Sequence, residues 1–82
     1  MNDEVTRFYV FNDTDGILAS TGAMTLEQAN HFIRCFPNRF AGQGYYLTAR
    51  RERISPESVV LRLINADSDE GRRIAQIEIE RE

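Results

Sequence analysis

Residues 25–37 read Thr-Leu-Glu-Gln-Ala-Asn-His-Phe-Ile-Arg-Cys-Phe-Pro, and this stretch decides the fold. Thr25 and Gln28 have the spacing of a capping box, in which the threonine hydroxyl and the glutamine side chain each satisfy a backbone N–H of the first turn. At 100° per residue, the apolar side chains share an arc about 120° wide. They are Leu26, Ala29, Phe32, Ile33 and Phe36. Pro37 forces the residue before it out of helical geometry. The stretch therefore predicts a helix over Leu26–Phe36 that lies on a sheet.

Two short stretches before this helix predict a β-hairpin. Arg7–Phe11 is aromatic and β-branched, which is typical of a strand. Asn12–Gly16 is dense in turn-forming residues, and its Asp-Gly pair can supply the positive φ that a hairpin turn needs. Ile17–Thr21 then returns as the second strand.

Three more strands are predicted after the helix. They are Tyr45–Ala49, Val59–Ile64 and Arg72–Glu80. A charged connection follows the first of them, and Ser55–Glu57 is expected to form a turn or a single helical turn. In the last segment apolar and polar residues alternate, which is typical of a half-exposed strand. The order ββαβββ predicts an α+β fold, with an antiparallel sheet of four or five strands and one amphipathic helix packed on one face.

Length and composition favour one small domain that spans residues 1–82. A chain of 82 residues, 41% of them hydrophobic, can bury a modest core. Its single cysteine, Cys35, excludes an internal disulfide. The acidic first residues lack the apolar run of a signal peptide, and no stretch approaches the roughly 20 apolar residues of a membrane helix. We therefore expect a cytoplasmic protein that does not associate with membranes.

The charges are unevenly distributed along the chain. All ten basic residues are arginine, and six of them lie between Arg34 and Arg62 with only two acids, a local net charge of +4. The whole chain has a net charge of -3, so its acidic pI conceals this positive segment. A GC-rich genome, which favours arginine codons, would account for the absence of lysine. Codon bias does not explain why the arginines cluster.

The candidate binding site lies where this positive segment meets two aromatic residues. It comprises Tyr45, Tyr46, Arg50, Arg51 and Arg53. In a strand the two tyrosines point to opposite faces, so one is expected inside and one exposed. Tyrosine and arginine are the residues that protein interfaces favour, and the same set could stack on bases and hold phosphates. A solvated loop beside an interior tyrosine is the third interpretation.

Other residue patterns give little support to catalysis or metal binding. His31 and Cys35 are one helical turn apart, but the chain holds no second cysteine or histidine to complete a zinc site. The acidic loop at Asp13–Gly16 lacks the flanking acids of a calcium-binding EF-hand, and a hairpin turn explains it better. Phosphate-loop, serine-hydrolase and zinc-protease motifs are also missing from the sequence. We expect a protein that is not an enzyme and that uses no metal or cofactor.

One half of the chain resembles a known group of proteins. Met24–Ala29 opens the helix, and Gly-Tyr-Tyr-Leu-Thr at 44–48 is followed by Glu-Arg-Ile at 52–54 and Pro-Glu at 56–57. This sequence pattern is similar to that of a group of small uncharacterised bacterial proteins, as found in planctomycetes. The resemblance implies a stand-alone small domain and carries no activity, substrate or site residue.

From these observations we expect a small non-enzymatic module that binds a protein partner or forms a homodimer through an exposed sheet edge. The alternative is a small nucleic-acid-binding protein that uses the loop at Arg50–Arg53 and the adjacent tyrosine.

Overall fold

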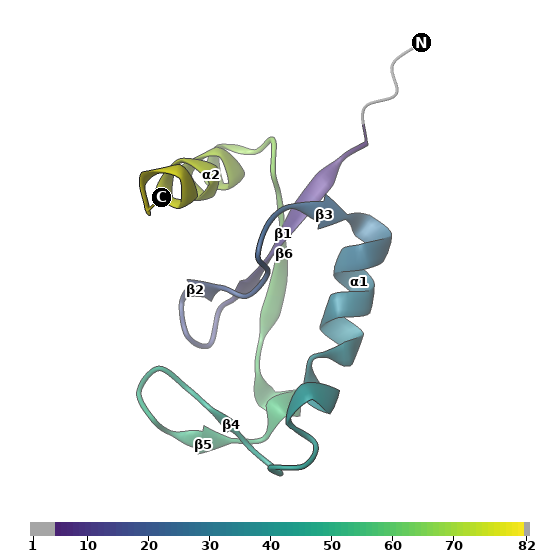
Figure 1. Ribbon diagram of the computed structural model, residues 1–82, viewed down its shortest axis with the longest axis vertical. Coiled ribbons are helices and arrows are strands. Elements are labelled where there is room, and N and C mark those ends of the chain that lie inside the picture. Colours follow the sequence, from purple (N-terminus) through teal and green to yellow (C-terminus); the bar gives the residue numbers. More distant parts are fainter. Residues whose placement is uncertain (1–4, 82) are drawn as a thin grey trace.

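The computed structural model describes residues 5–81 and shows an α+β fold (Figure 1). A four-stranded antiparallel sheet, a separate two-stranded sheet and two α-helices make up most of the described chain. The strands are β1 (Arg7–Asn12), β2 (Ile17–Leu18), β3 (Met24–Thr25), β4 (Tyr46–Leu47), β5 (Arg53–Ile54) and β6 (Leu61–Asn65). The helices are α1 (Leu26–Cys35), α2 (Asp69–Arg81) and the short 3-10 helices η1 (Pro37–Phe40) and η2 (Pro56–Ser58).

The strand β1 is the centre of the main sheet. It pairs antiparallel with β6 over five residues, from Phe8 opposite Asn65 to Asn12 opposite Leu61. Its other edge is shared by β2 and β3, which pair with opposite ends of β1. The predicted β1–β2 hairpin is thus confirmed, although its second strand covers only Ile17–Leu18 instead of Ile17–Thr21.

The predicted helix is confirmed as α1. Thr25 caps it, and both hydrogen bonds of the capping box to Gln28 are formed. The helix ends at Cys35, one residue earlier than predicted. The prediction that Pro37 forces the preceding residue out of helical geometry is wrong, because Phe36 keeps helical dihedral angles (φ -56°, ψ -49°) and leads directly into η1, which begins at Pro37. Because α1 packs on β1 and β3, it covers one face of the main sheet.

The prediction of a fifth strand over Arg72–Glu80 is wrong, because this segment is the helix α2. Ser68 begins the helix: its hydroxyl accepts a hydrogen bond from the backbone N–H of Gly71, and its carbonyl accepts one from Arg72. Asp69 and Glu70 in the first turn interact favourably with the positive end of the helix. A cap and an acidic first turn therefore outweigh an apolar alternation that is short enough to fit either structure.

In the middle of the chain a strand is present where one was predicted, but it is shorter than expected. The strand predicted at Tyr45–Ala49 covers only Tyr46–Leu47 and stands outside the main sheet. Its partner is β5, in a segment that the sequence had suggested was a connection. The expected helical turn after Ser55 is present as η2, but the Ser55 hydroxyl contacts the Glu57 carboxylate and does not cap the backbone.

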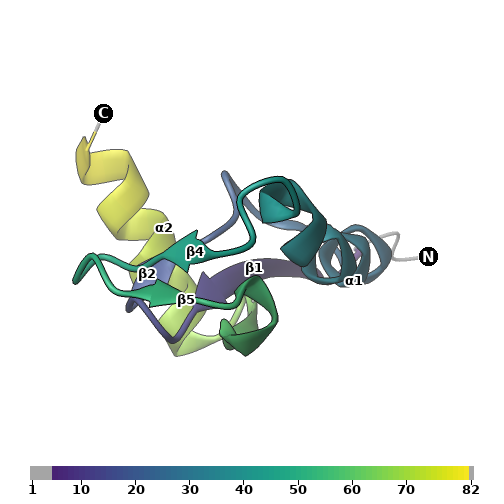
Figure 2. The same ribbon diagram turned by 90° about the horizontal axis from the view of Figure 1, so that it is seen from below.

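The core is small and lies on both faces of β1. Val10 and Ala29 are completely buried, and Tyr9, Phe36 and Ile64 are nearly so. The molecule is elongated, 47 × 27 × 19 Å, with the β4–β5 hairpin at one end. Seen from below, this hairpin crosses in front of β1 and β2 (Figure 2).

Candidate interaction hairpin

The β4–β5 hairpin is closed by a tight loop at residues 48–52. The N–H of Thr48 donates to the carbonyl of Glu52 at 3.0 Å, and the N–H of Arg51 donates to the carbonyl of Thr48 at 2.8 Å. Arg51 has a φ of 66° and is the only non-glycine residue with positive φ among those that the structure describes. This arrangement is a type I turn followed by a residue in the left-handed region, a position that glycine usually occupies.

The register of the hairpin separates its two faces. Tyr46 lies opposite Ile54, and Leu47 lies opposite Arg53. Since side chains alternate along a strand, Tyr45, Leu47 and Arg53 share the outer face. Leu47 is 46% exposed, and the Arg53 guanidinium lies 4.8 Å from the centre of the Tyr45 ring. The outer face therefore combines an aromatic ring, a cation stacked on it and an exposed apolar side chain.

Tyr46 is turned inward and serves the structure of the domain. Its ring packs against both Phe36 and Phe40, with centroids 5.5 and 5.0 Å away. Its hydroxyl donates to the Asp15 carboxylate at 2.6 Å and accepts from the Asn12 side chain at 3.2 Å. The pKa of Tyr46 is raised above its ordinary value, first because the residue is partly buried and then because of the Asp15 carboxylate. Of the two candidate tyrosines, only Tyr45 belongs to the outer face.

Asp15 attaches the hairpin to the rest of the domain. Its carboxylate accepts from the Ala49 N–H at 2.7 Å as well as from Tyr46. Its own N–H donates to the Asn12 side chain, which fixes the turn after β1. The sequence had marked Asp15 as a turn residue, but its role in positioning the hairpin depends on contacts 31 and 34 residues away. Local patterns contain no signal for such contacts.

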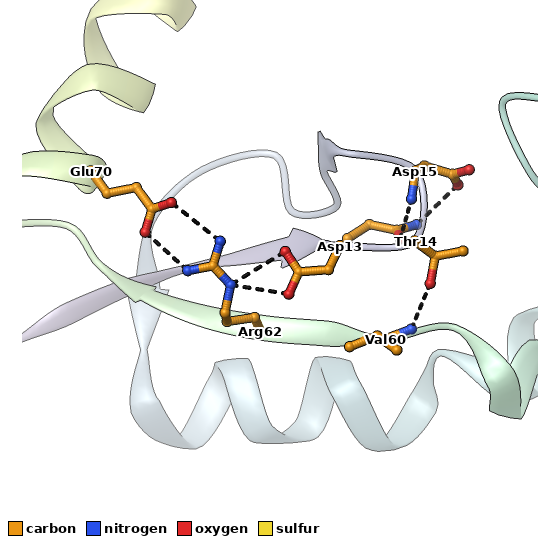
Figure 3. Close-up of polar contacts among 7 residues, drawn as sticks. Asp13, Thr14, Asp15, Val60, Arg62 and Glu70 are labelled. Carbon is orange, nitrogen blue, oxygen red and sulfur yellow. Dashed lines mark hydrogen bonds and ion pairs between the residues drawn. The ribbon is translucent and has the colours of Figure 1, made fainter.

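The turn after β1 also contacts β6 and the residue that precedes it, Val60 (Figure 3). The Asp13 N–H donates to the Val60 carbonyl, and the Val60 N–H donates to the Thr14 hydroxyl, both at 2.9 Å. The Asp13 carboxylate forms an ion pair with Arg62 at 3.0 Å. Asp13 and Asp15 are thus both engaged in contacts within the domain.

The arginine cluster of the sequence is divided in the structure. Arg62 lies between Asp13 and Glu70, and these carboxylates raise its pKa (Figure 3). Arg39 stacks on Phe32 at 4.4 Å from the ring centre. The arginines that remain together are those of the hairpin: Arg50 and Arg51 are exposed at its tip, and Arg53 lies on its outer face.

The structure brings His31 and Cys35 into contact but places no third ligand beside them. The Cys35 sulfur is 3.4 Å from Nε2 of His31 on the surface of α1. Within residues 5–81, no three His, Cys, Asp or Glu side chains form a group able to hold a metal ion. In the same range, no helix is long and apolar enough to cross a membrane.

Comparison of the chain with protein-family models, curated proteins and solved structures found no match.

Proposed function

We propose that this protein is a non-enzymatic protein-interaction module that binds an acidic partner surface through the outer face and tip of the β4–β5 hairpin. The contact residues are Tyr45, Leu47, Arg50, Arg51 and Arg53. One observation carries the proposal: an arginine occupies the left-handed position of the hairpin loop.

A side chain in this backbone conformation costs roughly 1 kcal/mol or more, because its Cβ crowds the neighbouring backbone. Arg51 adopts it with a φ of 66° at the exposed tip. No hydrogen bond or ion pair of the Arg51 side chain within the described domain offsets this cost. Strain of this kind is concentrated at functional positions, and a guanidinium that contacts a partner would account for it.

The composition of the outer face supports a protein partner. Tyrosine and arginine are enriched at the centres of protein interfaces, where they contribute large contact areas and charged hydrogen bonds. Arg53 is held against the Tyr45 ring, so less conformational freedom is lost when a partner binds. Leu47, 46% exposed, adds apolar area beside them. Three arginines against Glu52 make an acidic partner surface the complementary one.

The same geometry gives weaker support to nucleic-acid binding. Tyr46 has its ring packed against Phe36 and Phe40, and one side of the Tyr45 ring is covered by Arg53. Base stacking needs an open aromatic face, and general affinity for nucleic acid needs many phosphate contacts.

Site-specific photo-crosslinking tests the proposal. A photoreactive amino acid replaces Leu47 on the outer face, or Ile17 as a control, which is 53% exposed outside the hairpin. We expect a crosslinked protein from cell lysate with the probe at 47 and none with the probe at 17. The captured protein is then identified, purified and titrated against the wild type, Arg51→Gln and the control Arg34→Gln.

The expected result is a loss of about tenfold or more in affinity for Arg51→Gln, and no change for Arg34→Gln on the exposed surface of α1. Equal affinity of both variants would overturn the proposal. A labelled single-stranded oligonucleotide whose binding falls steeply with salt and is lost in Arg50→Ala/Arg51→Ala would establish the nucleic-acid alternative instead.

A further inference from the structure

The outer edge of β6 presents unpaired backbone groups. The Asp13 N–H donates to Val60, and the Ala66 N–H donates to Arg7, which fixes the residues of β6 that bond to β1. Because these residues alternate in an antiparallel ladder, the N–H and C=O of Leu61 and Leu63 point away from β1. Within the described chain, no strand or side chain pairs with them.

This edge lacks the devices by which proteins normally block an exposed strand. Five consecutive residues pair with β1 without a bulge, and β6 contains no proline and no lysine. Its one charged side chain, Arg62, is held by Asp13 and Glu70. By contrast, the opposite edge of β1 is covered by β2 and β3, and there the Ser20 hydroxyl accepts the Val10 N–H.

Apolar side chains border the open edge. Leu61 and Leu63 are half-buried, and Val60 is 57% exposed. Beside them lies a hollow of about 390 Å³ that is lined in part by Ile33, Pro56 and Val59. A strand added to β6 would therefore bury apolar surface in addition to forming backbone hydrogen bonds.

We infer that the occupant of this edge is a second copy of the same chain, with the two β6 strands paired antiparallel about a two-fold axis at Leu63. An antiparallel edge is complementary to itself, since each copy offers the same donors and acceptors in reversed order. The resulting eight-stranded sheet supplies additional burial to a domain whose described core contains only five buried hydrophobic residues.

The charge of Arg62 favours a two-fold axis at Leu63 over one at Arg62. With the axis at Leu63, Arg62 lies opposite Ile64 of the second copy, and Leu61 lies opposite Asn65. With the axis at Arg62, two guanidinium groups would face each other across the interface, which is unfavourable. Both registers keep the outward-pointing residues of the two strands opposite one another, as antiparallel pairing requires, so the charge of Arg62 decides between them. This dimer is independent of the partner proposed for the hairpin.

A single-cysteine experiment tests both the interface and its register. In a hydrogen-bonded antiparallel pair the Cα atoms are about 5.5 Å apart, which is within reach of a disulfide. In a Cys35→Ser background, Leu63→Cys is therefore expected to form a disulfide-linked dimer under mild oxidation. Arg50→Cys at the exposed hairpin tip, in the same background, is the control and is expected to form no disulfide-linked dimer.

Sedimentation of the unmodified chain completes the test. We expect a reversible monomer–dimer equilibrium for the wild type, and a shift of at least tenfold toward monomer in Leu63→Lys and Val60→Lys, which place a charge at the edge. Circular dichroism verifies that each variant is folded. If Leu63→Lys unfolds, the sedimentation of Val60→Lys still tests the interface. A wild type that stays monomeric at millimolar concentration, or a dimer that Leu63→Cys does not crosslink, would overturn the inference.

Discussion

The hydroxyl of Tyr46 donates a 2.6 Å hydrogen bond to the carboxylate of Asp15, which links the hairpin to the turn after the first strand. The same carboxylate accepts from the Ala49 N–H. The direction in which the three hairpin arginines project thus depends on one acidic residue of a distant turn.

Removal of this hydroxyl should destabilise the domain. We expect Tyr46→Phe to lower the free energy of unfolding by about 1–2 kcal/mol, because the part-buried Asp15 carboxylate loses a charge-assisted donor while the ring keeps its packing. Tyr45→Phe is the matched control and should change stability little, since no hydrogen bond of its hydroxyl is observed in the described structure. Urea denaturation measures both; equal values for the two variants would contradict the role given to Tyr46.

A glycine at the hairpin tip should stabilise the protein while it weakens binding. Arg51→Gly relieves the left-handed conformation, and we expect a gain of roughly 1 kcal/mol in thermal or urea unfolding. Arg50→Gly, at a position without positive φ, should instead lose about 0.5–1 kcal/mol through backbone entropy. A destabilised Arg51→Gly would show that the side chain of Arg51 supports the fold itself.

A side chain at position 71 should disturb the junction of β6 and α2. A Cβ on Gly71 would lie 2.2 Å from the Asn65 carbonyl oxygen, so backbone must move to accept it. We expect Gly71→Ala to cost about 1–3 kcal/mol and to reduce helical circular dichroism. Gly42→Ala is the control, because its Cβ would meet no atom within 4 Å. A neutral Gly71→Ala would mean that α2 is not held in this position.

Because of the ion pair between Arg62 and Glu70, the stability of the fold should depend on pH. The hydrogen bond from Arg62 is the main reason that the pKa of Glu70 is lowered from its ordinary value of 4.5. A carboxyl group whose pKa is lower in the folded state stabilises the protein at any pH above its pKa in the unfolded state. This stabilisation is lost as the pH falls through the pKa of the folded state. The stability of the wild type should therefore fall more steeply below pH 4.5 than that of Arg62→Gln. Denaturation midpoints measured from pH 7 down to about 2 check this, and parallel profiles would contradict it.

The parts of the fold that local chemistry specifies were predictable from the sequence. The capping box at Thr25 and Gln28 and the apolar arc of α1 act within a few residues, and so does the turn at Asn12–Gly16. The last segment shows the limit of such patterns. Its alternation fits a strand, but the cap at Ser68 and the acidic first turn make it a helix.

The candidate site could be predicted only in part from the sequence. The sequence alone determined that two adjacent tyrosines must face opposite sides and that three arginines share one short connection. Only the tertiary structure decided which tyrosine lies on the outer face of the hairpin, because that choice depends on the packing of Phe36 and Phe40 and on the carboxylate of Asp15. Asp15 is 31 residues away from Tyr46 in the sequence, and contacts between such distant residues are determined by the packing of the whole domain.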